Sequence, residues 1–295
     1  MDLRGRRVIV TGASSGVGLA CVEKLVARGA HVVMAVRDVP KAHRSAAKFP
    51  KDSVTIRHVD LSDRGSIERF AKETVNGEFG EVSILINNAG TLETKASNKD
   101  GVETTLLTNH IGPSYLTQLL LPVLGQVKFR EPDVRVVNVG SRLEKNAALD
   151  YNRPFLELLG NGSSANDKFS GWLEYANSKN MNLLSTNALQ RRHPTIQFNT
   201  VTPGMVNTSL SRNYSSWFLY LTYAARALLL KTPAAGADAV VCAATSREVK
   251  TGGSFLGDAG VALPHSRQHK GQAEEEAALS RTLEIIEYWQ RRIVK

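Results

Sequence analysis

Cysteine is scarce in this sequence, and long uncharged apolar runs are missing from it. The 295 residues include two cysteines, Cys21 and Cys242, with no spacing typical of metal ligands. Two isolated cysteines argue against a disulfide framework and fit a reducing compartment. No apolar run is long enough to span a bilayer, and the first apolar run follows Met1 too closely to leave room for a leader peptide. The sequence therefore predicts a soluble cytoplasmic protein without a metal site.

A dense basic stripe with interleaved aromatic residues is also missing, although the net charge is positive. The chain carries 37 Lys and Arg against 28 Asp and Glu, a formal net charge of +9. Such an excess can attract nucleic acid, an anionic membrane or an anionic cofactor. Because the basic residues are scattered along the chain, we expect no nucleic-acid partner. Internal repeats and low-complexity tracts are missing as well.

What the sequence does contain is an alternation of short apolar runs with segments of helical spacing. The apolar runs, typical of buried strands, lie at 8–10, 31–36, 54–59, 82–86, 134–139, 196–201 and 253–256. The helical segments lie at 19–26, 62–76, 100–124, 173–190, 233–244 and 274–292. With 42% hydrophobic residues, this alternation predicts one α/β domain over residues 1–295, a Rossmann-type doubly wound parallel sheet with helices on both faces.

A glycine-rich stretch follows the first apolar run and opens the first helical segment. It reads Thr-Gly-Ala-Ser-Ser-Gly-Val-Gly over residues 11–18. A strand, a glycine-rich turn and a helix are the context of a dinucleotide-binding loop. Gly12 permits the tight turn, Gly16 lets the backbone approach a pyrophosphate, and Gly18 lets the helix pack close to the strand. The N–H groups of the helix N-terminus would face the phosphates; the alternative is an ordinary loop with capping serines.

An arginine directly follows the second apolar run, where dinucleotide folds meet the adenosine ribose. Arg37 can pair with a ribose 2′-phosphate, with help from Ser14 and from Lys41 or Arg44. An acidic residue directly after the strand would bind a free 2′-hydroxyl. Here Arg37 holds that position and Asp38 comes one residue later. The pattern favours NADP(H) over NAD(H). The alternative is a helix-capping Asp38 beside a solvated arginine.

Polar residues and glycines follow the later strands, at the sheet edge where open parallel sheets bind ligands. Asp60 could accept a hydrogen bond from the adenine amino group, or it could close a turn. The turn at 87–90, Asn-Asn-Ala-Gly, suits a backbone that lines a ligand. Ser141, after the fifth strand, could donate a hydrogen bond to a substrate oxygen. The polar segment 142–171 is predicted to be an excursion near this site.

A tyrosine and a lysine are four residues apart in the helical segment at 173–190. At this spacing Tyr175 and Lys179 share one face of the helix. An ammonium group beside a phenol favours the phenolate, so Lys179 is expected to lower the pKa of Tyr175 from its usual value near 10. Such a tyrosine can donate or accept a proton near neutral pH.

Together these motifs resemble those of the short-chain dehydrogenase/reductase family, over about the first 210 residues and in the right order. The residues that carry the resemblance are Thr11, Gly12, Gly16, Val17, Gly18, Asp60, Asn87-Asn88-Ala89-Gly90, Asn109, Ser141, Tyr175, Lys179, Pro203-Gly204 and Thr208. Residues 33–38, residues 108–112 and the long interval from Ser141 to Tyr175 are most similar to the branch of retinol dehydrogenases, WW-domain-containing oxidoreductase and light-dependent protochlorophyllide reductase.

The resemblance implies a role for each site residue. Tyr175 would be the acid/base, Lys179 would lower its pKa and bind the nicotinamide ribose, and Ser141 would orient the substrate carbonyl. Asn109 would hold a water in a proton relay toward Lys179, and Thr208 would contact the carboxamide. The cofactor-binding residues implied are Gly12, Ser14, Ser15, Gly16, Val17, Gly18, Arg37, Asp60, Leu61, Asn88, Ala89, Gly90, Tyr175, Lys179, Pro203, Gly204, Val206 and Thr208.

The function implied is hydride transfer between NADP(H) and a carbonyl or alcohol group of a bulky hydrophobic substrate, such as a retinal-like or steroid-like compound or another lipophilic ketone or aldehyde. One alternative is light-driven reduction of a porphyrin double bond, against which the general family form of residues 87–90 argues. Another is a catalytically silent nucleotide-sensing protein, against which the intact catalytic residues argue. Gly140, where many relatives have serine, and Pro113, where this branch often has histidine, depart from the pattern.

The segment 209–231 is the expected substrate-loop region. Residues 217–221, Trp-Phe-Leu-Tyr-Leu, are too apolar for a solvated loop. They would form a lid over an apolar pocket, a buried packing helix, or a peripheral membrane contact flanked by Arg226 and Lys231. The expected partner is a small hydrophobic substrate. Membrane contact and assembly into a homo-oligomer are left open.

Overall fold

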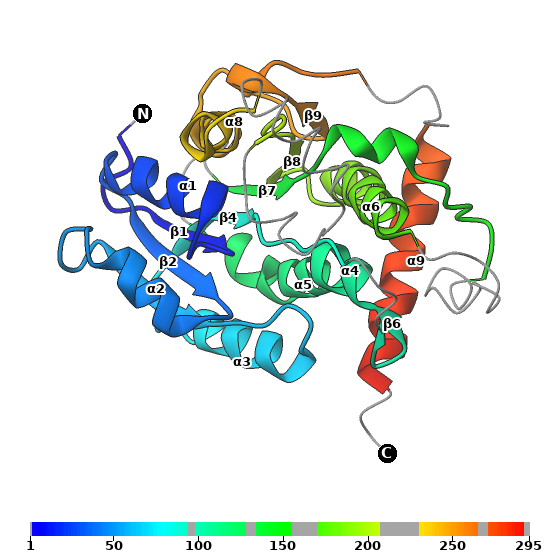
Figure 1. Ribbon diagram of the computed structural model, residues 1–295, viewed down its shortest axis with the longest axis horizontal. Helices are drawn as coiled ribbons and strands as arrows, with labels where there is room; N and C mark the ends of the chain where they lie inside the picture. Colours follow the sequence, from blue (N-terminus) through cyan, green and yellow to red (C-terminus); the bar gives the residue numbers. More distant parts are fainter. Residues whose placement is uncertain are drawn as a thin grey trace, which may run out of the picture.

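The computed structural model describes residues 2–93, 98–127, 134–154, 170–206, 230–264 and 271–291. Within these residues seven parallel strands form one sheet in the order β3-β2-β1-β4-β7-β8-β9 (Figure 1). The strands are β1 (Arg7–Thr11), β2 (His31–Val36), β3 (Val54–His58), β4 (Val82–Asn87), β7 (Arg135–Val139), β8 (Gln197–Val201) and β9 (Ser254–Leu256). The strand order reverses beside β1, which makes the gap between β1 and β4 the expected place for a ligand.

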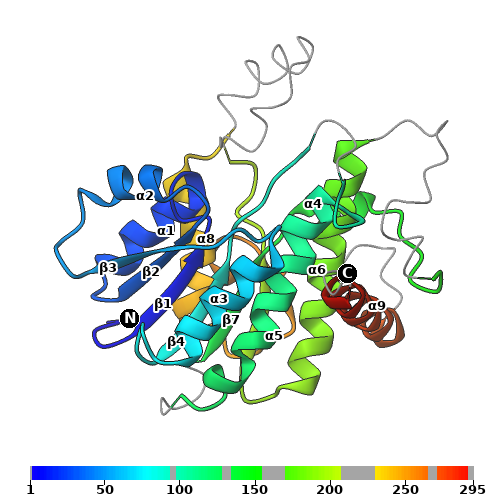
Figure 2. The ribbon, with the colours of Figure 1, turned by 90° about the horizontal axis from the view of Figure 1, so that it is seen from below.

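Helices cover both faces of this sheet, as Figure 2 shows. One face carries α1 (Gly16–Val26), α2 (Val39–Ala46) and α8 (Pro233–Thr245). The other carries α3 (Arg64–Val75), α5 (Gly112–Leu124) and α6 (Gly171–Arg192), with α9 (Gln272–Arg291) packed on α6. The predicted doubly wound α/β sheet is therefore confirmed.

The strands β1, β2 and β4 are mostly apolar because both faces of the sheet are covered there. In β1, Val8 and Val10 pack into the core under α1 and α8, whereas Ile9 packs into the core under α3, α5 and α6. All three side chains are fully buried. Side chains alternate across a strand, so an apolar residue at every position supplies both cores.

Side chains cap the N-termini of α2 and α3, whereas α1 has no such cap. Asp38 accepts a hydrogen bond from the Lys41 amide at 2.9 Å and starts α2, a helix that the sequence pattern did not predict. Asp63 accepts from the Ser66 amide at 2.8 Å and starts α3. The N-cap of α1, Ser15, makes no side-chain capping bond. The first N–H groups of α1 are thus left for another partner.

The predicted helix at 100–124 begins four residues later than expected. Asp100 and Gly101 have positive φ angles, 54° and 79°, and form the turn of a hairpin between β5 (Asn98–Lys99) and β6 (Val102–Glu103). Asp-Gly is a preferred pair for a turn with positive φ at both central residues. The helix starts with α4 (Thr104–Leu106) and passes through a π-helical turn, η1 (Leu107–Ile111), before α5.

The amphipathic closing helix α9 belongs to the main core. Trp289 of α9 is fully buried in this core, where its ring packs edge-to-face against Tyr115 of α5. Its Nε1 atom donates a hydrogen bond to Asp100 Oδ2 at 3.3 Å. This contact ties the end of the chain to the hairpin before α4. None of the helices among the described residues is long and apolar enough to cross a membrane.

Candidate functional site

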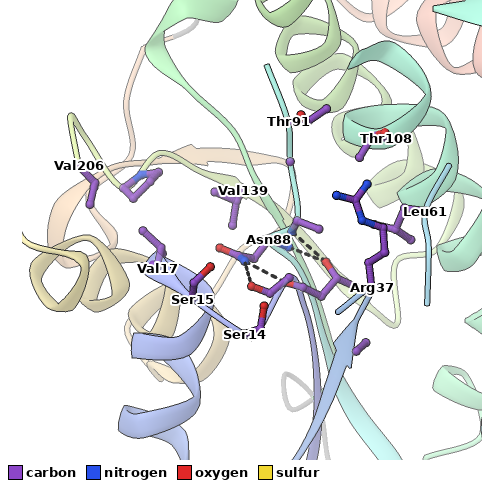
Figure 3. A pocket seen from close by; sticks show the side chains of 18 of the residues that line it. Ser14, Ser15, Val17, Arg37, Leu61, Asn88, Thr91, Thr108, Val139 and Val206 are labelled. Carbon is purple, nitrogen blue, oxygen red and sulfur yellow. Dashed lines mark hydrogen bonds between the residues drawn. The ribbon is translucent and has the colours of Figure 1, made fainter. Parts of the chain in front are cut away.

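A cavity of about 380 Å³ lies at the C-terminal edge of the sheet, between the ends of β1, β2, β3, β4, β7 and β8 (Figure 3). Every predicted cofactor-binding residue except Thr208 lines it, and so does Ser141. Thr208 and the predicted lid up to residue 229 lie outside the described residues, so their roles stay predictions. The fold thus brings residues from six strand ends into one cavity.

The glycine-rich loop is held in a tight conformation by the turn after β4. Asn88 Nδ2 donates to the Thr11 carbonyl at 2.8 Å, and Thr11 Oγ1 accepts from the amides of Asn88 and Ala89, both at 3.0 Å (Figure 3). Gly12 has a φ of 66°, and a Cβ on Gly18 would lie 2.4 Å from the Gly12 carbonyl oxygen. The loop therefore needs glycine at both positions.

The N-terminus of α1 opens into this cavity. Gly16, Val17 and Gly18 line it, and the first turn of α1 contains no acidic residue. Without a capping side chain or an acidic residue in the first turn, these N–H groups and the positive end of the helix dipole are available to an anion. The arrangement suits a phosphate group.

Cations lie where the predicted adenosine ribose would be. Arg37, exposed at the end of β2, lines the cavity beside Leu61, and Lys41 lines it from α2 (Figure 3). Arg44 is not among the lining residues. Asp38 also lines the cavity, but one of its carboxylate oxygens caps α2, so the alternative of a helix-capping Asp38 holds for this residue.

Asp60 closes a turn and also lines the cavity, and its bond to the adenine amino group stays a prediction. Its Oδ1 atom accepts hydrogen bonds from the Ser62 amide at 2.8 Å and from the Ser62 hydroxyl at 2.7 Å, which closes the turn after β3. Asp60 and Leu61 also line the cavity. A carboxylate fixed by such a turn can present its remaining surface to a ligand.

Ser141, Tyr175 and Lys179 meet in the interior part of the cavity. Tyr175 and Lys179, 7% and 4% exposed, share one face of α6 as predicted. Lys179 Nζ donates to the Val139 carbonyl at 2.7 Å and lies 5.4 Å from the centre of the Tyr175 ring. The Ser141 side chain hydrogen-bonds Tyr175. These three residues can hold and protonate one oxygen atom.

Burial dominates the ionisation of this group. It raises the pKa of Tyr175 to about 12, against the opposing hydrogen bond from Ser141, and it lowers the pKa of Lys179 to about 8. The expectation that Lys179 lowers the tyrosine pKa below its usual value is wrong for this structure. A buried phenolate lacks solvation, and the ammonium donates to the Val139 carbonyl.

Asn109 lies behind the cavity rather than in its lining. Its Oδ1 atom accepts from the Thr91 amide at 2.7 Å, and its Nδ2 atom donates to the Thr91 carbonyl at 2.8 Å and to Ser178 Oγ at 3.2 Å. Thr91 lines the cavity, and Ser178 precedes Lys179. The Asn109 amide therefore ties the loop after β4 to α6. The water that Asn109 would hold stays a prediction.

Sequence reasoning missed several lining residues that lie beside the motifs it found. Thr91 follows the Asn-Asn-Ala-Gly turn, Val59 precedes Asp60, and Val139 ends β7. Their position at strand ends was a usable signal, because ligands in such sheets contact the carboxyl ends of the strands. Thr108 lines the cavity from η1 without any such signal.

Packing against β8 explains why residue 140 is a glycine, where many relatives have serine. A Cβ on Gly140 would lie 2.6 Å from Cγ2 of Thr200 on the neighbouring strand β8. A serine here would require Thr200 to move, so Gly140 and Thr200 fit each other. The neighbouring Ser141 keeps its place at the end of β7.

Comparisons with known proteins show the family of this chain. Residues 6–151 match the family model described as short chain dehydrogenase. Human retinol dehydrogenase 12 is 34% identical over 266 residues, a match that covers 88% of this chain and 79% of that protein. Human WW domain-containing oxidoreductase is 31% identical over 285 residues, covering 94% of this chain but only 66% of that protein's length.

Solved structures have the same fold. A putative uncharacterized protein from Mycobacterium Paratuberculosis superposes with a TM-score of 0.75 at 29% identity, covering 97% of this chain and 95% of that one. A 3-ketoacyl-(acyl-carrier-protein) reductase from Brucella melitensis, complexed with NADH, has a TM-score of 0.66 at 22% identity, covering 88% and 100%. The chain belongs to the short-chain dehydrogenase/reductase family of oxidoreductases, in its retinol dehydrogenase-like branch.

Proposed function

We propose that this protein transfers a hydride between NADP(H) and the carbonyl or alcohol carbon of a small hydrophobic substrate. The observation that carries the proposal is the meeting of Ser141, Tyr175 and Lys179 in the cavity that the glycine-rich loop and Arg37 also line. One cavity therefore offers an anion-binding end and a proton-transfer end.

The lining residues fit a dinucleotide cofactor. The uncapped N-terminus of α1 and the glycine cradle, in which a Cβ on Gly18 would be only 2.4 Å from backbone, suit a pyrophosphate. Arg37 and Lys41 suit the additional charge of a 2′-phosphate. When bound, the nicotinamide ring of such a cofactor supplies or takes up the hydride.

Three residues of the chain bind the substrate oxygen and supply its proton. For carbonyl reduction, Tyr175 donates its hydroxyl proton to the substrate oxygen, and Ser141 donates a hydrogen bond to the same atom. Lys179 as a cation stabilises the phenolate that Tyr175 becomes. Asn109 fixes the position of the loop at Thr91 relative to the helix at Ser178, through hydrogen bonds to both residues.

Apolar side chains near the cavity support a hydrophobic substrate. Met205, 59% exposed, lies between the lining residues Gly204 and Val206. Trp172 and Leu173, also exposed, lie at the start of α6, just before Tyr175. The printed name of the relative retinol dehydrogenase 12 makes retinal-like aldehydes the first compounds to test.

The test is cofactor oxidation with a panel of carbonyl compounds. Purified protein is incubated with NADPH or NADH and with retinal-like, steroid-like and simple aliphatic aldehydes or ketones, and the loss of cofactor fluorescence is followed. We expect faster NADPH oxidation with the lipophilic members. NADPH binding without turnover of any member would contradict the proposal and favour a nucleotide-sensing protein, whereas a copurified porphyrin pigment consumed only in light would favour a protochlorophyllide reductase-like reaction.

Replacement of Arg37 tests the cofactor preference. Arg37→Ala is expected to weaken NADPH binding by about ten- to a hundredfold, because a hydrogen bond to a charged group contributes about 1.5–3 kcal/mol. NADH affinity should stay unchanged, since NADH has no 2′-phosphate. Arg44→Ala, at a residue outside the cavity lining, is the matched control. Fluorescence titration measures both affinities, and an equal loss for both cofactors would overturn the NADP(H) assignment.

The rate of carbonyl reduction should depend on Lys179 ionisation. Lys179 is a cation below its pKa of about 8, and Tyr175, with a pKa of about 12, stays protonated throughout the range from 6 to 10. We therefore expect kcat/KM to fall as pH rises through about 8, because the cation that stabilises the phenolate is lost. A pH profile of kcat/KM measures this. A rate that rises between pH 7 and 10 would contradict it.

A further inference from the structure

The π-helical turn η1 leaves the Asn109 carbonyl to be held by a side chain. In this turn the Gly112 amide donates to the Leu107 carbonyl, five residues earlier. Pro113 has no N–H and so cannot donate the ordinary helical bond to the carbonyl of Asn109. Asn182 of α6 reaches this carbonyl and donates to it from Nδ2 at 3.0 Å. The backbone of Asn109 is thus fixed from α6.

A chain of buried hydrogen bonds continues from Asn182 to the C-terminal helix. Asn182 Oδ1 lies 2.8 Å from His110 Nδ1, and His110 Nε2 lies 2.8 Å from Thr282 Oγ1 on α9. His110 and Thr282 are fully buried. Ser185 Oγ lies 3.2 Å from Thr282 Oγ1. The chain therefore joins η1, α6 and α9.

The partners determine the direction of the bonds from Asn182 to the Asn109 carbonyl and to His110. The Asn109 carbonyl only accepts, so Asn182 must turn Nδ2 toward it and Oδ1 toward His110. His110 Nδ1 must then carry the proton. Burial lowers the pKa of His110 to about 4, so the ring is neutral at pH 7 and Nε2 is an acceptor. The Thr282 hydroxyl, 2.8 Å from both Nε2 and the Ala278 carbonyl, shares its one proton between these two acceptors.

Asn109 connects this chain to the cavity. Its main chain receives the bond from Asn182, while its side chain holds the Thr91 amide and Ser178 Oγ. Thr91 lines the cavity, and Ser178 is adjacent to Lys179. A shift of the Asn109 backbone would therefore move a cavity wall relative to the catalytic lysine.

We infer that His110 and Thr282 are positioning residues for the proposed reaction: through Asn182 they hold Asn109 in the orientation that keeps Thr91 in place relative to Lys179. The inference rests on the proposed function for its kinetic consequence, but the positioning itself can be measured without turnover. It makes α9 part of the support of the site, although α9 contributes no residue to the cavity lining described above.

The kinetic test removes one hydroxyl from α9. Thr282→Val keeps the side-chain shape and removes the hydroxyl that His110 Nε2 contacts. We expect kcat to fall about three- to tenfold, the factor that one hydrogen bond is worth, with KM for NADPH unchanged because the cofactor-binding residues are untouched. Thr282→Ser should restore kcat. Thr245→Val is the matched control, since Thr245 is also buried and donates to the carbonyl four residues earlier, but on α8.

A second measurement does not depend on activity. The Thr91 amide donates to Asn109 Oδ1, so its hydrogen exchange, followed by NMR, reports the positioning directly. Thr282→Val should speed exchange at Thr91 about three- to tenfold, and Thr245→Val should not. The inference is overturned if Thr282→Val and Thr245→Val lower the melting temperature alike while Thr91 exchange stays unchanged. If exchange responds but wild type turns over no carbonyl compound, the proposed function fails and the positioning stands.

Discussion

Replacing Tyr175 with phenylalanine is expected to reduce turnover by about 10²–10⁴-fold, the usual contribution of a general acid–base group. The ring would keep its packing in α6, but no hydroxyl would remain to protonate the substrate oxygen. NADPH affinity should be retained, because the phosphate-binding end of the cavity consists of the glycine-rich loop and Arg37. Steady-state kinetics and fluorescence titration of NADPH measure the two quantities separately.

Tyr151 offers a matched control for this variant. Tyr151 is also buried, and its hydroxyl donates to Asn180 Oδ1 at 2.7 Å, outside the cavity lining. Tyr151→Phe removes a buried tyrosine hydroxyl and should lower stability without lowering turnover. Turnover of Tyr175→Phe within about tenfold of wild type would be incompatible with an acid–base role.

Replacing Lys179 with methionine should abolish turnover and at the same time stabilise the fold at neutral pH. The loss of the cation removes the stabilisation of the phenolate. The gain in stability arises because burial makes the charged ammonium of Lys179 unfavourable in the folded state, as the lowering of its pKa to about 8 shows. Allowing for the Val139 carbonyl left without its donor, we expect the free energy of unfolding to rise by about 1–2 kcal/mol.

The stabilisation by Lys179→Met should depend on pH in a defined direction. The pKa of Lys179 is about 8 in the folded protein, against the ordinary value of 10.5 for a lysine in the unfolded chain. Between these values the unfolded chain binds more protons, so the stability of wild type rises with pH in this window. The advantage of Lys179→Met is therefore largest below pH 8 and shrinks toward pH 10.5.

Thermal unfolding of both proteins at pH 7 and pH 9.5 measures the pH dependence. Lys24→Met is the control, because Lys24 pairs with Asp238 on the surface. A variant that is less stable than wild type at pH 7, or a difference that grows with pH, would show that burial of Lys179 is not unfavourable. A variant that is stable and still turns over substrate would contradict the proposed role of the cation.

Sequence alone determined those features that depend on local pattern. Parallel strands covered on both faces are mostly apolar along their length, so the alternation of apolar runs and helical segments predicted the doubly wound sheet. The carboxyl ends of such strands share one edge. Polar residues and glycines after successive strands could therefore be assigned to one site, and Gly12, Arg37, Asn88, Ser141 and Tyr175 do line one cavity.

Local pattern was less informative where two structures share the same signals. Asp100 and Gly101 could begin a helix or form a tight turn, and only the pairing of Asn98–Lys99 with Val102–Glu103 decided for the turn. The helix α2 is short, and its start at Asp38 was considered only as an alternative to ribose binding. Short elements carry too few residues for a clear period.

Only the tertiary structure decided the energetics of the site. A tyrosine and a lysine four residues apart suggest a lowered tyrosine pKa, but burial of Tyr175 raises it, since solvation depends on every element packed around the ring. The support of Asn109 joins His110, Asn182 and Thr282, which lie far apart in the sequence. Burial and long-range hydrogen bonds are properties of the packed chain, and no local spacing of residues encodes them.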